Sequence, residues 1–221
     1  MSSGLLWGEF TKNDKKHCNP SIPVSVLAAN VLYTATSKYP LLVNWDANLL
    51  RESETTWHPP PLDWIKINVD VALMDSNLAS VGGVARDSKG TLLLAFGKKK
   101  LHWDINQLEL EAIFTLKHFI QNWKYDCKGL IIEGDNYNTI KFLRNSVVNY
   151  SAIGKISEQI SFLQDFNKVI FHHIPHNFNR VANLCATLAL QNNFFFNSIY
   201  APDIPSSLTC LLKNEYEACL S

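Results

Sequence analysis

Apolar and polar residues alternate along three consecutive stretches of the chain, 64–72, 79–86 and 91–97. In the first stretch Ile65, Ile67 and Val69 alternate with polar side chains, and this period of two is typical of a half-buried β-strand. Asp87-Ser88-Lys89-Gly90 separates the second stretch from the third and forms a turn motif, because glycine tolerates a positive φ. The three stretches are therefore predicted to be successive antiparallel strands.

Beyond residue 104 the apolar residues recur with the period of an amphipathic helix. The stripe over 105–123 comprises Ile105, Leu108, Ala112, Ile113, Leu116 and Ile120. Asp104 stands where an N-cap is expected. The remaining pattern predicts strands at 129–133 and 169–174 and helices at 137–144, 153–166 and 178–191. This order predicts an α/β fold with one five-stranded mixed sheet, its first three strands antiparallel, and helices on both faces.

The periodic pattern covers only the middle of the chain. Residues 1–56 show no sustained period, and we expect a poorly structured or partly helical N-terminal extension that ends at the stiff Trp57–Pro61 stretch. Residues 57–191 are predicted to form the domain. Residues 192–221 are predicted to be a C-terminal tail, which includes the aromatic tract Phe194–Phe196.

Composition narrows the class of protein without identifying it. Apolar residues make up 47% of the 221 residues, enough for a substantial core, and the formal net charge is +0. Binding to nucleic acid would therefore depend on local basic patches and not on a global field. The five cysteines show no metal-binding spacing, which favours free thiols in a reducing compartment. With no signal peptide and no unbroken apolar span, we expect a soluble, intracellular monomer that does not bind membranes.

Three acids lie on different predicted elements. Asp70 and Asp135 end strands, and Glu109 lies on the apolar stripe of the helix. A carboxylate on a core-facing stripe is costly unless a cation or hydrogen-bond donors meet it. Each acid alone has an ordinary alternative, since a strand-end Asp often caps a loop and Glu109 can reach solvent near the helix N-terminus. Together they predict a divalent metal site.

Longer motifs around these acids share their order and spacing with one known family. The residues are Trp57-x-Pro59-Pro60, Lys66-Ile67-Asn68-Val69-Asp70, Gly82-Gly83-Val84-x-Arg86-Asp87-x-x-Gly90, Glu109-x-x-Ala112, Glu133-x-Asp135 and His173-x-Pro175-x-x-x-Asn179-Arg180-Val181-Ala182-Asn183-x-x-Ala186. On these residues the chain resembles the type 1 ribonuclease H domain, in the retroelement-related, reverse-transcriptase-like branch common in plants.

The resemblance implies metal-dependent endonucleolytic hydrolysis of RNA in RNA–DNA hybrids. It implies two Mg²⁺ ions, with Mn²⁺ as a substitute, and places catalytic and metal-binding roles on Asp70, Glu109, Asp135 and Asn183. His173 falls on the histidine that the family uses near proton transfer and product release. Its ordinary alternative is a structural pair with His172 on an alternating strand. In two-metal hydrolysis one ion helps to form the attacking hydroxide and the other stabilises the leaving oxygen.

Three positions depart from the family pattern. Asn183 replaces the fourth acid and removes one negative charge, which weakens the hold on a second ion. Val71 replaces the usual glycine after the first Asp, and His176 replaces an arginine near the phosphate. The alternative function is therefore a catalytically inactive, retroelement-derived module that binds nucleic acid or protein, the latter through the aromatic tract 194–196.

Nucleic-acid contact is predicted at two places. Lys98, Lys99 and Lys100, followed by His102 and Trp103, form a basic and aromatic cluster at a strand end, suited to phosphates and stacking. A solvated strand end explains the same cluster equally well. The candidate set for nucleic-acid binding is completed by His176, Asn179 and Arg180.

Overall fold

The computed structural model describes residues 56–102, 104–120, 127–148, 154–198 and 200–220. The N-terminal extension predicted for residues 1–56 lies outside this range except for its last residue, and so do Trp103 and Cys18.

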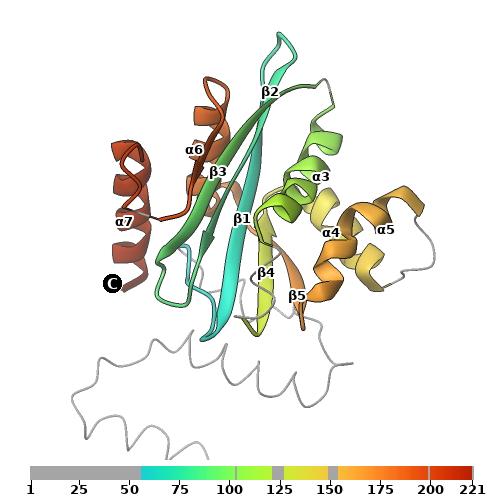
Figure 1. Cartoon of the computed structure of the whole chain (residues 1–221), viewed down its shortest axis with the longest axis horizontal. Helices are drawn as coiled ribbons and strands as arrows, with labels where there is room; N and C mark the ends of the chain where they lie inside the picture. Colours follow the sequence, from blue (N-terminus) through green and yellow to red (C-terminus); the bar gives the residue numbers. More distant parts are fainter. Residues whose placement is uncertain (1–55, 103, 121–126, 149–153, 199, 221) are drawn as a thin grey trace, which may run out of the picture. The chain divides into compact units, whose positions relative to one another are not determined.

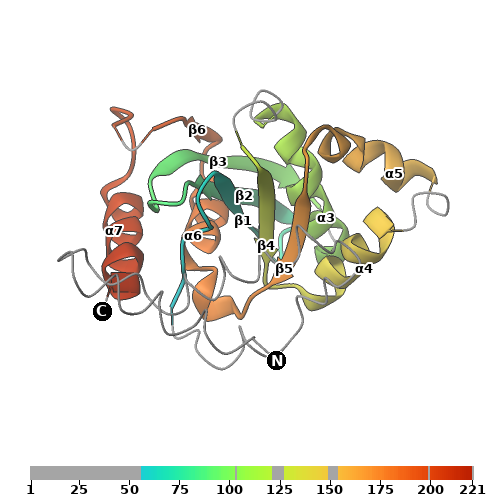
Figure 2. The ribbon, with the colours of Figure 1, turned by 90° about the horizontal axis from the view of Figure 1, so that it is seen from below.

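A mixed sheet of six strands forms the centre of the described domain (Figures 1 and 2). Its strands are β1 (Trp64–Leu73), β2 (Leu78–Arg86), β3 (Leu92–Leu101), β4 (Gly129–Gly134), β5 (Val169–His173) and β6 (Phe194–Phe196). The order across the sheet is β5-β4-β1-β2-β3-β6. β1, β2 and β3 pair antiparallel, whereas β4 runs parallel to both β1 and β5. The predicted antiparallel start and mixed character of the sheet are confirmed, and β6 adds one strand to the five expected.

Helices cover both faces of the sheet, as predicted. They are α3 (Ile105–Thr115), α4 (Tyr137–Val148), α5 (Gly154–Ile160), α6 (Arg180–Ala189) and α7 (Ser206–Leu220). Short 3₁₀ turns occur at Leu116–His118, Ser161–Asp165 and His176–Phe178. Figure 1 shows α3, α4 and α5 on one side of the sheet and α6 and α7 on the other. No helix among the described residues has the length and apolar character needed to cross a membrane.

The helix α3 begins where the sequence predicts. The Asp104 side chain accepts hydrogen bonds from the backbone N–H groups of Asn106 and Gln107, which confirms it as the N-cap. Ile105 was expected on the buried stripe but is 40% exposed, because the first turn of the helix precedes its contact with the sheet. The α-helix ends at Thr115 and tightens into a 3₁₀ turn, short of the predicted end at residue 123.

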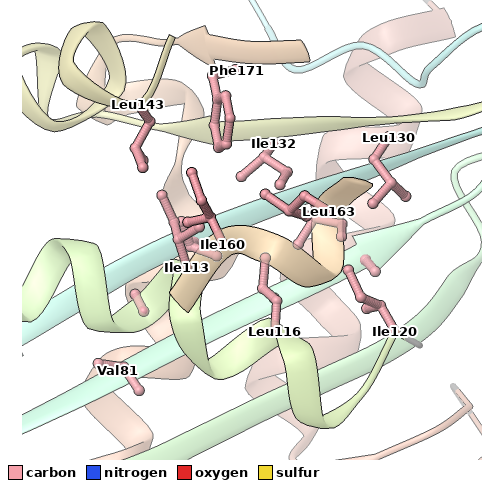
Figure 3. Packing of buried hydrophobic residues seen from close by; sticks show 14 of the residues in the cluster. Val81, Ile113, Leu116, Ile120, Leu130, Ile132, Leu143, Ile160, Leu163 and Phe171 are labelled. Carbon is pink, nitrogen blue, oxygen red and sulfur yellow. The ribbon is translucent and has the colours of Figure 1, made fainter. Parts of the chain in front are cut away.

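The larger apolar core lies between the sheet and the helices α3, α4 and α5. Figure 3 shows its packing: Ile113 of α3, Leu116 of the 3₁₀ turn that follows and Leu143 of α4 meet Ile132 of β4 and Phe171 of β5. These side chains are all at most 3% exposed. A second, smaller cluster lies on the opposite face and comprises Val84, Leu92, Ala95, Val181, Cys185, Phe196, Leu208 and Leu212.

The C-terminal segment 192–221 is not the tail that the sequence predicts. β6 pairs antiparallel with β3, and α7 packs its Leu208 and Leu212 into the second core cluster. Within the aromatic tract, Phe196 is buried and its ring stacks on Phe194. Phe195 is the exposed member, with 49% of its surface accessible. The tract therefore belongs mainly to the fold. The pattern failed here because β6 has only three residues and α7 buries a narrow stripe.

A glycine on β2 lets α6 approach the sheet closely. A Cβ atom on Gly82 would lie 2.2 Å from the backbone nitrogen of Ala186, a distance at which something must shift. Gly82 pairs with Asp70 across the β1–β2 ladder. The small residue therefore lets the middle of α6 pack against the sheet beside Asp70, and Asn183 lies one turn earlier on the same helix.

Candidate functional site

The site lies where the parallel strand β4 ends beside β1. The last residue pair between β1 and β4 is Asn68 with Glu133. Asp70 lies two residues beyond this pair, so β4 does not pair with β1 at Asp70 and this flank of β1 is open. β1 itself continues to Leu73, so Asp70 is not its last residue as predicted. Asp135 follows β4 directly and occupies the open flank. Ligand sites in α/β sheets form at such carboxyl ends of strands.

Asp70 is a buried carboxylate with an unsatisfied oxygen. It is 4% exposed, its Oδ1 accepts a 2.8 Å hydrogen bond from the Val71 N–H, and its Oδ2 has no partner within the described parts of the chain. Burial and the nearby Asp135 carboxylate raise the pKa of Asp70 to about 6, although the Val71 N–H, the Asn183 side chain and the His176 ring oppose the rise. A buried oxygen left unpaired is a position that a cation can occupy.

Glu109 faces the same place from α3, on the second turn of the helix. It is 6% exposed, and burial together with the charges of Asp70 and Asp135 raises its pKa to about 8. Glu111, two residues later, points elsewhere and forms an ion pair with Lys100. The helix-face argument from the sequence thus separates the two glutamates as the structure does.

A pH-dependent stability follows from Glu109. The pKa of Glu109 in the folded protein lies above the ordinary 4.5. At low pH the buried carboxyl group is neutral and costs little. As the pH rises from 4.5 toward about 8 the unfolded chain ionises more readily than the folded one, so the metal-free protein loses stability. Glu109→Gln is expected to leave stability unchanged near pH 4.5 and to raise the free energy of unfolding by about 3–5 kcal/mol above pH 8. Chemical denaturation in chelator measures the effect. Glu111→Gln serves as control and should change stability by less than about 1 kcal/mol at either pH.

The remaining predicted residues approach Asp70 from two further segments. Asn183, in the first turns of α6, lies close enough to the Asp70 carboxylate to lower its pKa. The Nδ1 atom of His176 lies 2.5 Å from Oδ2 of Asp135, and Asp135 raises the pKa of that histidine. His173 places its Nε2 3.1 Å from the backbone oxygen of Asp135, and burial lowers its pKa. Asp70, Asp135 and His176 each offer one ligand atom within 4.8 Å of the others.

Beneath this site lies a buried ion pair to which the sequence assigned no role. Glu133 is 2% exposed, and its carboxylate meets the Lys66 ammonium at 2.9 Å, the His172 ring at 3.1 Å and the Asn68 amide at 2.9 Å. Burial alone would raise the pKa of Glu133, but Lys66 and His172 outweigh it and lower the pKa to about 2. His172 is thus the structural member of the histidine pair, and His173 faces the site.

A second buried network joins Trp57, β1, β2 and α7. The Arg86 guanidinium, 1% exposed, lies 3.3 Å from the centroid of the Trp57 ring, donates to Asn68 Oδ1 and pairs with Glu215 of α7 at 2.7 Å. Trp57 donates to the same Asn68 oxygen. The sequence motifs include Trp57 and Arg86, but no role was predicted for either residue. Glu215 lies in the segment predicted to be a tail, and no sequence pattern indicated that it is buried.

Two of the predicted nucleic-acid contacts change in the structure. Asn179 was expected to touch nucleic acid, but it is 1% exposed and donates to the backbone oxygen of Val69, so its amide ties α6 to β1. The three lysines of β3 do not form one cluster, since the alternation of the strand sends Lys98 and Lys100 to the α3 face and Lys99 to the other. Lys98, Lys99 and Arg180 are exposed.

A family model described as reverse transcriptase-like matches residues 68–189, more than half of the chain. The match spans Asp70, Glu109, Asp135, His173 and Asn183 and stops before β6. No match was found among curated proteins.

Several solved ribonucleases H resemble the structure. The ribonuclease H1 of Halobacterium salinarum is 17% identical, with 58% of this chain and 98% of that chain covered and a TM-score of 0.48. An N-terminal ribonuclease H domain from Mycobacterium tuberculosis is 13% identical, with 57% and 93% covered and a TM-score of 0.49. A compost-derived ribonuclease H1 solved in complex with an RNA/DNA hybrid is 18% identical, with 57% and 96% covered and a TM-score of 0.48.

Proposed function

The chain belongs to the reverse transcriptase-like family and has its ribonuclease H-like fold, and we propose that it hydrolyses the RNA strand of RNA–DNA hybrids with the help of divalent metal ions. The single observation that carries the proposal is an oxygen of the buried Asp70 that has no partner in the described part of the chain and that lies near Asp135, Glu109 and Asn183. Four separate elements supply these four side chains. The mutual repulsion of the three carboxylates, Asp70, Glu109 and Asp135, has no structural benefit without a cation.

The donor set fits a hard divalent cation. Carboxylate and amide oxygens are the ligands that Mg²⁺ prefers, and Asp70, Glu109, Asp135 and Asn183 would hold it. When bound, the metal would supply Lewis-acid activation of water and stabilise charge on the phosphate.

His173 and two exposed cations would support this chemistry. The lowered pKa of His173 leaves its imidazole neutral near neutral pH, so Nδ1 can accept a proton while Nε2 donates to the backbone oxygen of Asp135. Exposed Lys98 and Arg180 are suited to contact the phosphates of a bound duplex.

The central test is cleavage of an end-labelled RNA–DNA hybrid by the full chain with Mg²⁺ and then with Mn²⁺. Internal cleavage of the RNA strand alone, abolished by chelator, would support the proposal. RNA and DNA duplexes of the same sequence serve as substrate controls and should remain intact. A folded protein that leaves the hybrid uncut with both ions would refute the proposed activity.

Asn183→Asp is expected to raise Mg²⁺-dependent cleavage on the order of tenfold and to lower the Mg²⁺ concentration needed. Two ions carry four positive charges, and Asp70, Glu109 and Asp135 supply three negative ones. A restored carboxylate supplies the fourth. Titration of the cleavage rate with Mg²⁺ measures the effect, and Asn192→Asp, an exposed change beyond α6, should leave the rate unchanged.

A catalytically inactive nucleic-acid-binding protein is the second candidate. The neutral Asn183 and the pairing of Asp135 with His176 favour it, because both reduce the negative charge available to a metal. Salt-dependent binding of the hybrid without cleavage, in both the wild type and the Asn183→Asp variant, would select this function.

A further inference from the structure

His176 contacts the acidic residues of the site, although the sequence predicts that it contacts a phosphate. Its Nδ1 atom is 2.5 Å from Asp135 Oδ2, and it is one of the three groups whose ligand atoms fall within 4.8 Å of one another. The third group is Asp70, a residue that is 4% exposed and whose Oδ2 has no hydrogen-bond partner among the described residues. The ring therefore points to the place where an unsatisfied carboxylate oxygen is held.

We propose that His176 is a metal ligand and that, together with Asp70 and Asp135, it makes the site select Mn²⁺ over Mg²⁺. The inference deepens the proposed function and rests on it, because the same acids serve the ion in both. Two carboxylates and one imidazole form a mixed oxygen and nitrogen donor set. Mg²⁺ prefers oxygen ligands and gains little from an imidazole, whereas Mn²⁺ accepts both.

The geometry allows the ring to coordinate after a small movement. Ligand atoms about 2.1 Å from an ion in octahedral geometry lie roughly 3 Å apart, so Nδ1 must retreat from Asp135 by about half an ångström. The His176 side chain is 67% exposed and sits in a 3₁₀ turn of only three residues, so little packing opposes that movement. The exposed ion pair that is lost has a small stabilising effect.

The substitution at Asn183 gives this ligand its importance. A neutral amide next to Asp70 leaves the site one charge short for a second Mg²⁺ ion. An imidazole nitrogen is a donor that Mn²⁺, as a transition ion, binds better than Mg²⁺ does, and it adds no negative charge. When the ion is Mn²⁺, the imidazole of His176 thus offsets the loss of the fourth carboxylate at Asn183.

Calorimetric titration of the full, metal-free chain with Mn²⁺ and with Mg²⁺ tests the proposal. The wild type should bind Mn²⁺ at least about tenfold more tightly than Mg²⁺. His176→Gln, which keeps a polar side chain of similar reach, should weaken Mn²⁺ binding about tenfold or more and change Mg²⁺ binding less than about twofold. The matched control His118→Gln alters an exposed histidine away from the site and should change neither affinity.

A spectroscopic measurement separates coordination from an indirect effect. Pulsed electron paramagnetic resonance of the Mn²⁺-loaded wild type should show ¹⁴N coupling from a coordinated imidazole, and His176→Gln should lack it. Mn²⁺ is the suitable probe because it has little affinity for thiols, and Cys210 is exposed. Absence of the coupling, equal loss of both ions in His176→Gln, or no Mn²⁺ binding by the wild type would overturn the proposal.

Cleavage assays on the same samples keep the two proposals distinguishable. A chain that binds Mn²⁺ through His176 and leaves the hybrid uncut would refute the nuclease and support the ligand. A chain that cuts the hybrid and shows identical metal affinities in the wild type and His176→Gln would support the nuclease and overturn the ligand.

Discussion

Deletion of α7, by ending the chain after Asp203, is expected to abolish cooperative folding. Leu208 and Leu212 are 0% and 6% exposed, and burying each stabilises the fold by about 1.5–3 kcal/mol. Removing Glu215 leaves the buried Arg86 without its carboxylate partner, at a cost of about 3–5 kcal/mol. The sum is comparable to the roughly 5–15 kcal/mol of a typical domain. Loss of the thermal unfolding transition would report the effect.

A single substitution in α7 isolates the ion pair. Glu215→Gln should lower the free energy of unfolding by about 3 kcal/mol. Glu217→Gln removes the same charge from an exposed position on the same helix and should change stability by less than about 1 kcal/mol. A shortened chain that still unfolds cooperatively with wild-type stability would show that α7 is dispensable.

Asp70→Asn is expected to reduce hybrid cleavage about a thousandfold or more, because the buried carboxylate would hold the catalytic metal. The same change should raise the stability of the metal-free protein by about 2–3 kcal/mol near pH 7, since Asp70 has its pKa raised to about 6 and is charged there against its surroundings. Loss of activity with gain of stability is the pattern of a residue kept for function.

Two measurements on Asp70→Asn check the expectation: the cleavage rate at saturating metal and the urea midpoint in chelator. Asp75→Asn, in the exposed turn between β1 and β2, should alter neither. A stability that falls in Asp70→Asn would contradict the argument, because it would make the carboxylate part of the folding framework.

Period and turn chemistry were sufficient to predict the central elements of the fold. Asp104 caps α3 as expected, and Gly90 adopts a positive φ of 74° in the predicted turn. Strands and helices that bury one broad face repeat their pattern over several residues, so the signal is strong. β6 spans three residues and is held by pairing with β3, and no periodicity can appear over so short a stretch.

The candidate site was predictable in its residue types and less so in their contacts. The apolar stripe predicted that Glu109 faces the core and that Glu111 points away from it. In the structure Glu109 is buried and Glu111 pairs with Lys100. The ion pair of His176 with Asp135 and the inward turn of Asn179 depend on how α6 enters the sheet. Side-chain contacts between segments distant in the sequence leave no local pattern.

The placement of β6 has a consequence for how the protein behaves at high concentration. In the described sheet the outermost strands are β5 and β6, with five and three residues. Without β6, the ten-residue β3 would expose the backbone N–H and C=O groups of Ala95–Gly97 to other molecules. Long open edges recruit strands from neighbouring chains and seed aggregation, and short ones resist it. The three phenylalanines of β6 thus protect the domain from self-association along an edge that a shorter chain would leave open.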